Sequence, residues 1–250
     1  STIGIKTNAF NDQITKEVKK INNQLELELD KISIILDPFK FKLVIKTIGA
    51  NLKNKNKLIK LESVKSNIDI KTFINKKFSL SELDINTRTI EIKNLISFVR
   101  SIEDNPQIFI LEKLVKKGYL IADINLKFDQ KGNIKDDFII KGFVKDGEVK
   151  PFKKIDLSKI NFIFNIQNNE FKLKDINLSY DNNDLTFPEL DVKKQKNKFL
   201  ISGKNNSKNL VFDDKKFNKL FNSDFSNLKI KSAEFDLENT FSFKIDDKYK

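Results

Sequence analysis

The sequence has no cysteine, no histidine, no methionine and no tryptophan, and only 7 glycines and 4 prolines. Without histidine and cysteine, the chain has no imidazole acid–base group, no thiol nucleophile and no thiolate or imidazole ligand for zinc or haem. Carboxylate chemistry needs neither residue. However, the pairs Asp136-Asp137, Asp213-Asp214 and Asp246-Asp247 fall in polar turns or at a chain end, where solvated acids are expected. We therefore expect no enzymatic activity, no metal and no cofactor.

Long apolar runs are also missing. No stretch of 18 or more apolar residues occurs, so the sequence predicts no membrane-spanning helix. Residues 1–10 have neither the basic region nor the apolar region of a signal peptide. The sequence begins at Ser1 without a methionine, which indicates a piece of a longer protein. With 250 residues, 39% of them hydrophobic, the chain is expected to fold around a core.

The charged residues are basic in excess but are almost all lysines. The chain carries 47 basic and 35 acidic residues, a formal net charge of +12. Arg88 and Arg100 are the only arginines, whereas nucleic-acid readers use the bidentate guanidinium group. The lysines also alternate with acids along the chain. We expect them to form a polar strand face, and we expect no nucleic-acid partner.

Apolar and polar residues alternate through most of the chain, with a period of two. This pattern is typical of an antiparallel sheet with one apolar and one wet face. Polar turn signals at 129–133, 146–147, 168–169 and 181–183 separate the runs and predict that consecutive strands pair as a meander. The clearest alternating runs are Leu25 to Leu29, Phe39 to Ile45, Leu120 to Phe128 and Ile160 to Ile166.

Three short helical segments interrupt the predicted strands. In the first, Ile14 and Val18 form an apolar stripe that should dock on the sheet, with Thr7 or Asn8 as N-cap. Gly118 is expected to close the second. The predicted order, within a single β-rich segment, is a helix in residues 1–24, first strands in 25–93, a helical insertion in 94–118, a β-meander in 119–212, a short helix in 213–222 and final strands in 223–250.

One strand pattern recurs, in which the alternation slips by one residue midway. It reads apolar-x-apolar-x-x-apolar-x-apolar. Such a slip turns every later side chain to the other face unless a β-bulge or bend absorbs the extra residue. The pattern therefore predicts strands that bend at a fixed place and keep one continuous apolar face. It occurs in FSLSELDI (78–85), FKLKDINL (171–178) and LKIKSAEF (228–235), and in part in IKLESVKS (59–66).

These bent elements resemble the recurring strands of the AsmA/TamB superfamily, envelope proteins anchored in the bacterial inner membrane. The opening STIGIKTNAFNDQI and the strand region LELELDKISIILDPFKFKL are similar to the part of such proteins that follows their membrane anchor. The stretch GYLIADINLKFDQKGNIKDDFIIKGFVKD resembles their hairpins. The resemblance covers most of the chain but includes no sharp motif.

The resemblance implies a long, twisted antiparallel sheet curved into a groove with an apolar floor, alongside a few short helices. It also implies a non-enzymatic envelope scaffold that carries phospholipid acyl chains between the inner and outer membranes. Such a protein would lie in the periplasm, anchored to the inner membrane by a segment upstream of Ser1, with other envelope proteins as possible partners.

The alternating pattern alone leaves a closed β-sandwich open as the alternative fold, with a structural or interaction role in the envelope. An uncovered apolar groove would exceed the apolar patch that soluble monomers usually expose. Acyl chains could fill such a groove. Ordinary core packing is the alternative role for each residue that we expect to line it. These residues are Phe78, Leu80, Ile124, Leu126, Phe128, Phe162, Phe164, Phe171 and Leu173.

Overall fold

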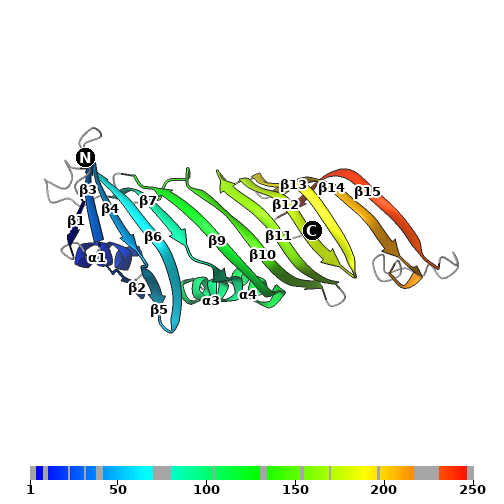
Figure 1. Cartoon of the computed structure of the whole chain (residues 1–250), viewed down its shortest axis with the longest axis horizontal. Coiled ribbons are helices and arrows are strands. Elements are labelled where there is room, and N and C mark those ends of the chain that lie inside the picture. The colour runs from blue at the N-terminus through cyan, green and yellow to red at the C-terminus, as the bar shows by residue number, and fades with distance from the viewer. Residues whose placement is uncertain are drawn as a thin grey trace. The chain divides into compact units, whose positions relative to one another are not determined.

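The computed structural model describes most of the chain (Figure 1). Over these residues the protein is mainly β, with short helices and one open, curved antiparallel sheet. The open sheet confirms the predicted fold class, and the closed β-sandwich is wrong for the described part. The described residues are 4–7, 11–21, 23–30, 32–37, 42–69, 80–103, 105–129, 134–152, 155–168, 170–195, 198–216 and 231–246.

The chain divides into two compact units. Unit 1 comprises Ser1–Lys113 and Leu120–Gly142, and unit 2 comprises Leu114–Tyr119 and Phe143–Lys250. In unit 1, the strands pair in the order β1-β3-β4-β6-β7-β9, while β2 pairs with β5, β5 with β6, and β8 with β9. The elements are β1 (Gly4–Thr7), α1 (Asn11–Ile21), β2 (Leu25–Glu28), β3 (Ile32–Asp37), β4 (Lys42–Ile48), β5 (Asn51–Asn54), β6 (Lys57–Asp69), β7 (Leu80–Thr87), β8 (Ile90–Glu91), α3 (Ile92–Ile102), α4 (Pro106–Leu114) and β9 (Val115–Lys127), whose first residues belong to unit 2.

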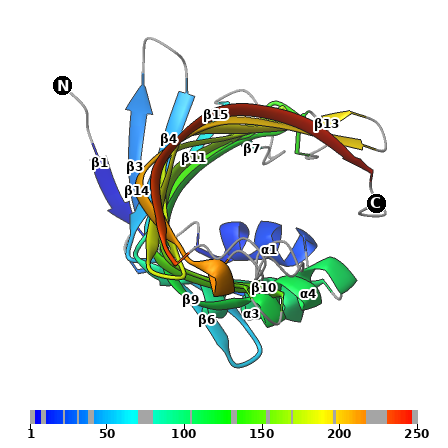
Figure 2. The same cartoon turned by 90° about the vertical axis from the view of Figure 1, so that its right-hand side faces the viewer.

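Two helices cover part of the apolar side of the unit 1 sheet. Ile14 and Val18 lie one turn apart on α1, and both pack against buried strand residues. On α3, Phe98 is buried in the same core as Val18. Figure 2 shows α1 lying inside the curve of the strands of this unit. The predicted docking of the N-terminal helix on the sheet is therefore confirmed.

Unit 2 is a meander of long strands, as the turn signals predicted. Its strands are hydrogen-bonded in sequence order from β10 to β15. Asp181 and Asn182 both have positive φ, 49° and 66°, as a two-residue type I′ hairpin turn requires. The strands are β10 (Ile139–Phe152, which begins in unit 1), β11 (Ile155–Gln167), β12 (Glu170–Tyr180), β13 (Asn183–Gln195), β14 (Lys198–Phe212) and β15 (Ala233–Asp246).

The recurring strand pattern marks real irregularities in the sheet. In IKLESVKS, the β6–β7 register shifts between Leu61 and Ser63. In FSLSELDI, Leu80 and Glu82 pair with the consecutive residues Ile68 and Asn67, so β7 holds an extra residue there. In FKLKDINL, Asp175 has a φ of 52° where the register with β11 changes. The predicted bulges are therefore confirmed in these three copies, while residues 228–230 of the fourth lie outside the described residues.

Several local predictions are wrong. Asp146-Gly147 is not a turn, because β10 runs through it. Asp146 takes a φ of 52° there, and its backbone N–H donates to Asn161 Oδ1 at 3.0 Å, so the strand accommodates this residue without turning back. Gly118 does not close a helix, because α4 ends at Leu114 and Gly118 is buried within β9.

Two further predictions concern the start of the N-terminal helix and the helix in residues 213–222. Thr7 belongs to β1 and so cannot cap α1, and Asn8 is outside the described residues. Of the predicted helix 213–222, residues 214–216 are helical and 217–222 are not described.

Candidate functional site

The strands of unit 2 build one continuous apolar face, which we call the unit 2 apolar face. Cross-strand pairing aligns its side chains in rows that run across β11 to β15. The bulge at Asp175 keeps the apolar residues of β12 on this face on both sides of the slip. One row contains Phe164, Leu173, Leu190, Gly203 and Phe241, and the next contains Ile166, Phe171, Val192, Ile201 and Phe243.

The side chains of this face lean toward one another. Phe187 on β13 and Phe241 on β15 approach edge to face, with ring centroids 6.4 Å apart, although β14 lies between their strands. Neighbouring strands in a sheet are about 4.8 Å apart, so two strands separated by a third are about 10 Å apart. The rings close part of this gap above β14, where Gly203 has no side chain. The apolar side chains therefore crowd together, as on the concave side of a curved sheet.

The apolar face has buried and exposed parts. Phe164 is only 7% exposed, but Phe171 and Phe243 are 38% and 46% exposed. In the described part of unit 2, the helical residues are 214–216 and Leu114, which is the last residue of α4, so no longer helix of that part packs on this face. Unit 1 differs, because α1 and α3 pack on its apolar residues. Large apolar side chains of unit 2 thus remain available to a ligand.

The opposite side of each unit is polar and carries cross-strand pairs. In unit 1, Asn125 Nδ2 donates to Glu82 and Asp84 of β7, at 2.8 and 2.6 Å. In unit 2, Lys204 Nζ on β14 lies 3.1 Å from Glu238 on β15. These contacts agree with the prediction that the lysines form a wet strand face with the acids.

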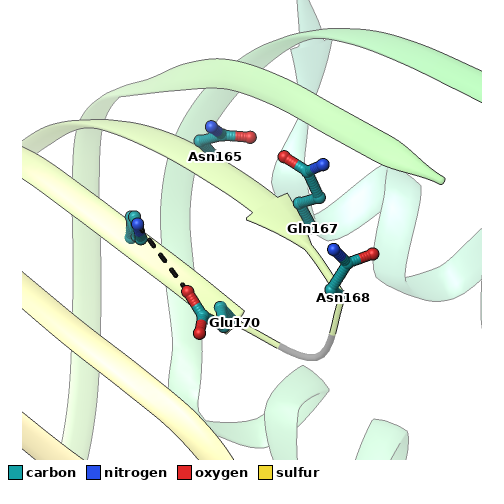
Figure 3. A pocket seen from close by; sticks show the side chains of 5 residues that line it. Asn165, Gln167, Asn168 and Glu170 are labelled. Carbon is teal, nitrogen blue, oxygen red and sulfur yellow. Dashed lines mark ion pairs between the residues drawn. The ribbon is translucent and has the colours of Figure 1, made fainter. Parts of the chain in front are cut away.

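A shallow polar depression of about 230 Å³ lies at the β11–β12 hairpin, on the polar side of unit 2 (Figure 3). Its residues alternate along the strands with those of the apolar face, so the two sets point to opposite sides. Ligand pockets for drug-sized molecules are mostly apolar. This depression does not have that character. It is lined by Asn165, Gln167, Asn168, Glu170 and Lys172.

An ion pair beside this depression shifts a carboxyl pKa. A hydrogen bond from Lys193, whose Nζ lies 3.0 Å from Glu170 Oε1, lowers the pKa of Glu170, and the charges of Lys193 and Lys172 lower it further. The pKa of Glu170 is lower in the folded chain than in the unfolded chain. Any contribution of this ion pair to the free energy of unfolding is therefore fully present at a pH above the pKa that Glu170 has in the unfolded chain. It is lost as the pH falls through the folded pKa.

Removing the lysine should therefore move this titration. In Lys193→Gln, the pKa of Glu170 is expected to rise toward the ordinary glutamate value, because the ammonium group of Lys193 and its positive charge are gone. A carbon-13 NMR titration of the side-chain carboxyl measures it. Lys174→Gln, on the same face of β12, serves as the control and should leave this pKa in place. An unchanged pKa in Lys193→Gln would show that the ion pair does not form in solution.

The predicted lining residues fall in both units. In unit 2, Phe162, Phe164, Phe171 and Leu173 come together: the Phe162 and Phe164 rings are 6.3 Å apart, Phe164 pairs with Leu173, and Phe171 pairs with Ile166. Their position on the apolar face agrees with the prediction, while a lining role stays a prediction.

In unit 1, Ile124 pairs with Ile85 and Leu126 pairs with Leu83, so both lie in rows of apolar residues. Phe128 is half-buried and forms an isolated bridge with Ile134. Leu80 is the first residue of β7 and pairs with Ile68, and Phe78 lies outside the described residues.

Sequence reasoning missed most of the apolar residues of β13 and β15. The segment LTFPELDV (185–192) is another copy of the bent pattern, with Leu185, Phe187, Leu190 and Val192 at its apolar positions. The alternation in β15 also places Phe235, Leu237, Phe241 and Phe243 on one face. The signal that predicted Phe171 and Leu173 would have found these residues too.

No protein-family model, curated protein or solved structure matches the chain. Among the described helices, none has both the length and the apolar character needed to cross a membrane. In the same part of the chain, no three acidic side chains gather as a metal site would require. Of the surfaces described, the unit 2 apolar face is therefore the candidate site that stands out on physical grounds.

Proposed function

We propose that the unit 2 apolar face binds phospholipid acyl chains. The observation that carries the proposal is a wide sheet face, with large apolar side chains in successive rows, on which no described helix of unit 2 packs. Burying one methylene group gains about 0.8 kcal/mol, so an acyl chain along these rows is bound without any polar contact. Phenylalanine and isoleucine suit acyl-chain binding because they are bulky and their apolar contacts do not require a particular orientation of the ligand.

The proposal extends to a role in the bacterial envelope. In line with the resemblance to the AsmA/TamB superfamily, the protein would act as a non-enzymatic scaffold in the periplasm that carries phospholipid between the inner and outer membranes. It would be held at the inner membrane by an anchor. Lysines of the polar face and of the strand ends would contact lipid phosphates. Each lysine would contribute about 1 kcal/mol to binding near an anionic surface. The resemblance supports this part of the proposal, and the open apolar face is compatible with it.

Lipid binding is tested by organic extraction of the purified chain, followed by titration with a fluorescent fatty acid. Phospholipid is expected in the extract in amounts comparable to the protein, and the fatty acid should compete with it. An extract without phospholipid, together with no binding of the fatty acid, would overturn the proposal. A structural or interaction domain, the other candidate, predicts this outcome and negligible binding of a hydrophobic dye.

A matched pair of variants locates the binding surface. Phe171→Glu combined with Phe243→Glu places two charges on exposed positions of the unit 2 apolar face and is expected to weaken fatty-acid binding at least about tenfold, because each lost ring contact removes more than 1 kcal/mol. Ile163→Glu changes a side chain that is 51% exposed on the opposite face of β11. It should change binding less than about twofold. Equal losses in both variants would place the ligand elsewhere.

A further inference from the structure

The described part of the sheet ends in two very different edge strands. At one end, β1 has four residues, and at the other, β15 has 14. Among the described strands, β15 pairs with β14 alone, as Figure 1 shows for the red strand. In an antiparallel pair, alternate residues direct their N–H and C=O groups away from the partner strand. The outer edge of β15 therefore carries a long row of backbone donors and acceptors.

This edge has charged side chains but lacks the other features that protect natural edge strands. Such strands are commonly short, bulged, or interrupted by proline or inward-pointing charges, because an open edge otherwise pairs with other chains. The strand β15 contains no proline and no glycine. In the only irregularity of its pairing, between Ser207 and Leu210, the extra residue lies in β14. The strand β1 is protected because it is short, whereas β15 is long.

The charge of β15 is opposite to that of the whole chain. Four acids, Glu234, Asp236, Glu238 and Asp246, and one lysine, Lys244, give it a formal charge of −3 in a chain of +12. These residues alternate with the apolar ones, so they share the polar face. On the inner side, β14 meets this row with a lysine, because Lys204 lies 3.1 Å from Glu238. A strand added on the outer side would meet the same acidic row.

We propose that the outer edge of β15 binds a protein strand in which apolar residues alternate with lysines. The apolar residues of this strand would extend the rows that end in Phe241 and Phe243, and its lysines would pair with the acids as Lys204 does. A second copy of the chain fits poorly at this edge. The strand β1 is too short to cover it. In a pair of β15 strands each strand brings a formal charge of −3: antiparallel pairing about residues 239–241 sets Glu234 against Asp246, two like charges, and gives a lysine only to Asp236, which faces Lys244.

The test uses two peptides labelled with fluorescein, six repeats of Val-Lys and six repeats of Val-Glu. The lysine peptide is expected to bind the full chain at least about tenfold more tightly than the glutamate peptide, and its binding should weaken as salt is added. In residue-resolved hydrogen exchange, alternate amides of β15 should become protected on binding. No binding of the lysine peptide, equal binding of both peptides, or binding without protection of β15 would overturn the proposal.

Charge reversal provides the matched variants. Glu234→Lys combined with Glu238→Lys should invert the preference, so that the glutamate peptide binds more tightly. Asp156→Lys reverses an acid of β11 in the same unit and should leave the preference unchanged, because it lies outside the edge strand. Circular dichroism confirms that each variant is folded. A dimer in analytical ultracentrifugation, with alternate amides of β15 protected from exchange in the absence of peptide, would overturn the proposal and show that the edge is used by a second copy. The test involves no lipid, so its result is independent of the acyl-chain proposal.

Discussion

Replacing Phe98 by alanine is expected to lower the free energy of unfolding of unit 1 by about 3–5 kcal/mol. Phe98 is 4% exposed and packs in the core that joins α3 to the sheet, together with Leu25, Ile59 and Ile90. Alanine would remove the ring and leave a cavity, because strands and helix surround the site and can close only in part. Urea denaturation, with hydrogen exchange to assign the loss to unit 1, measures the change.

The neighbouring residue gives the control. Val99 lies on the same helix but is 36% exposed, so Val99→Ala should change the free energy of unfolding by less than about 1 kcal/mol. Similar losses in both variants would mean that α3 does not dock through Phe98. The apolar side of unit 1 would then be covered by α1 alone, and the contrast between the two units would be smaller.

The alternation of apolar and polar residues was enough to predict the sheet, its two faces and its meander. It worked because a strand places successive side chains on opposite faces, whatever the rest of the fold does. The slipped pattern went further and predicted where Asp175 and the extra residues of β6 and β7 would lie. This was possible because a bulge is the local way to keep an apolar face continuous after a slip.

Other features depend on contacts that local patterns do not contain. Asp146-Gly147 has the composition of a hairpin turn, yet β10 continues through it, because Asn161 of β11 accepts the hydrogen bond of the Asp146 N–H. The segment at Gly118 looked like a helix end, but the helix had already given way to β9 at Val115.

The difference between the two apolar faces is also a tertiary property. The sequence shows where apolar faces occur, but the position of the helices decides which face is covered. Phe164 and Leu173 were predicted as lining residues because they follow the alternating pattern. Leu83, which follows the same pattern, belongs to the unit whose apolar side receives α1 and α3.

Replacing Gly203 by valine is expected to destabilise unit 2 by about 2 kcal/mol or more, although valine normally favours strands over glycine. A Cβ atom at this position would lie 2.8 Å from the Phe241 ring and 2.9 Å from the backbone oxygen of Glu189. The ring can rotate away, but the oxygen belongs to the neighbouring strand β13 and moves only if the pairing of β13 with β14 changes. The glycine therefore allows the close approach of these strands.

Denaturation of Gly203→Val and of Ser202→Val tests this explanation directly. Ser202 is the preceding residue and lies on the polar face, paired with Asp191 and Ser242, so valine there meets no apolar crowding and should be neutral or slightly stabilising. Adding Phe241→Ala to Gly203→Val should recover only part of the loss, because the contact with the Glu189 oxygen remains. Equal stability of the two single variants would mean that β13 and β14 are farther apart than described. The Phe187 and Phe241 rings would then not meet above β14, and the apolar face proposed to hold acyl chains would be flatter.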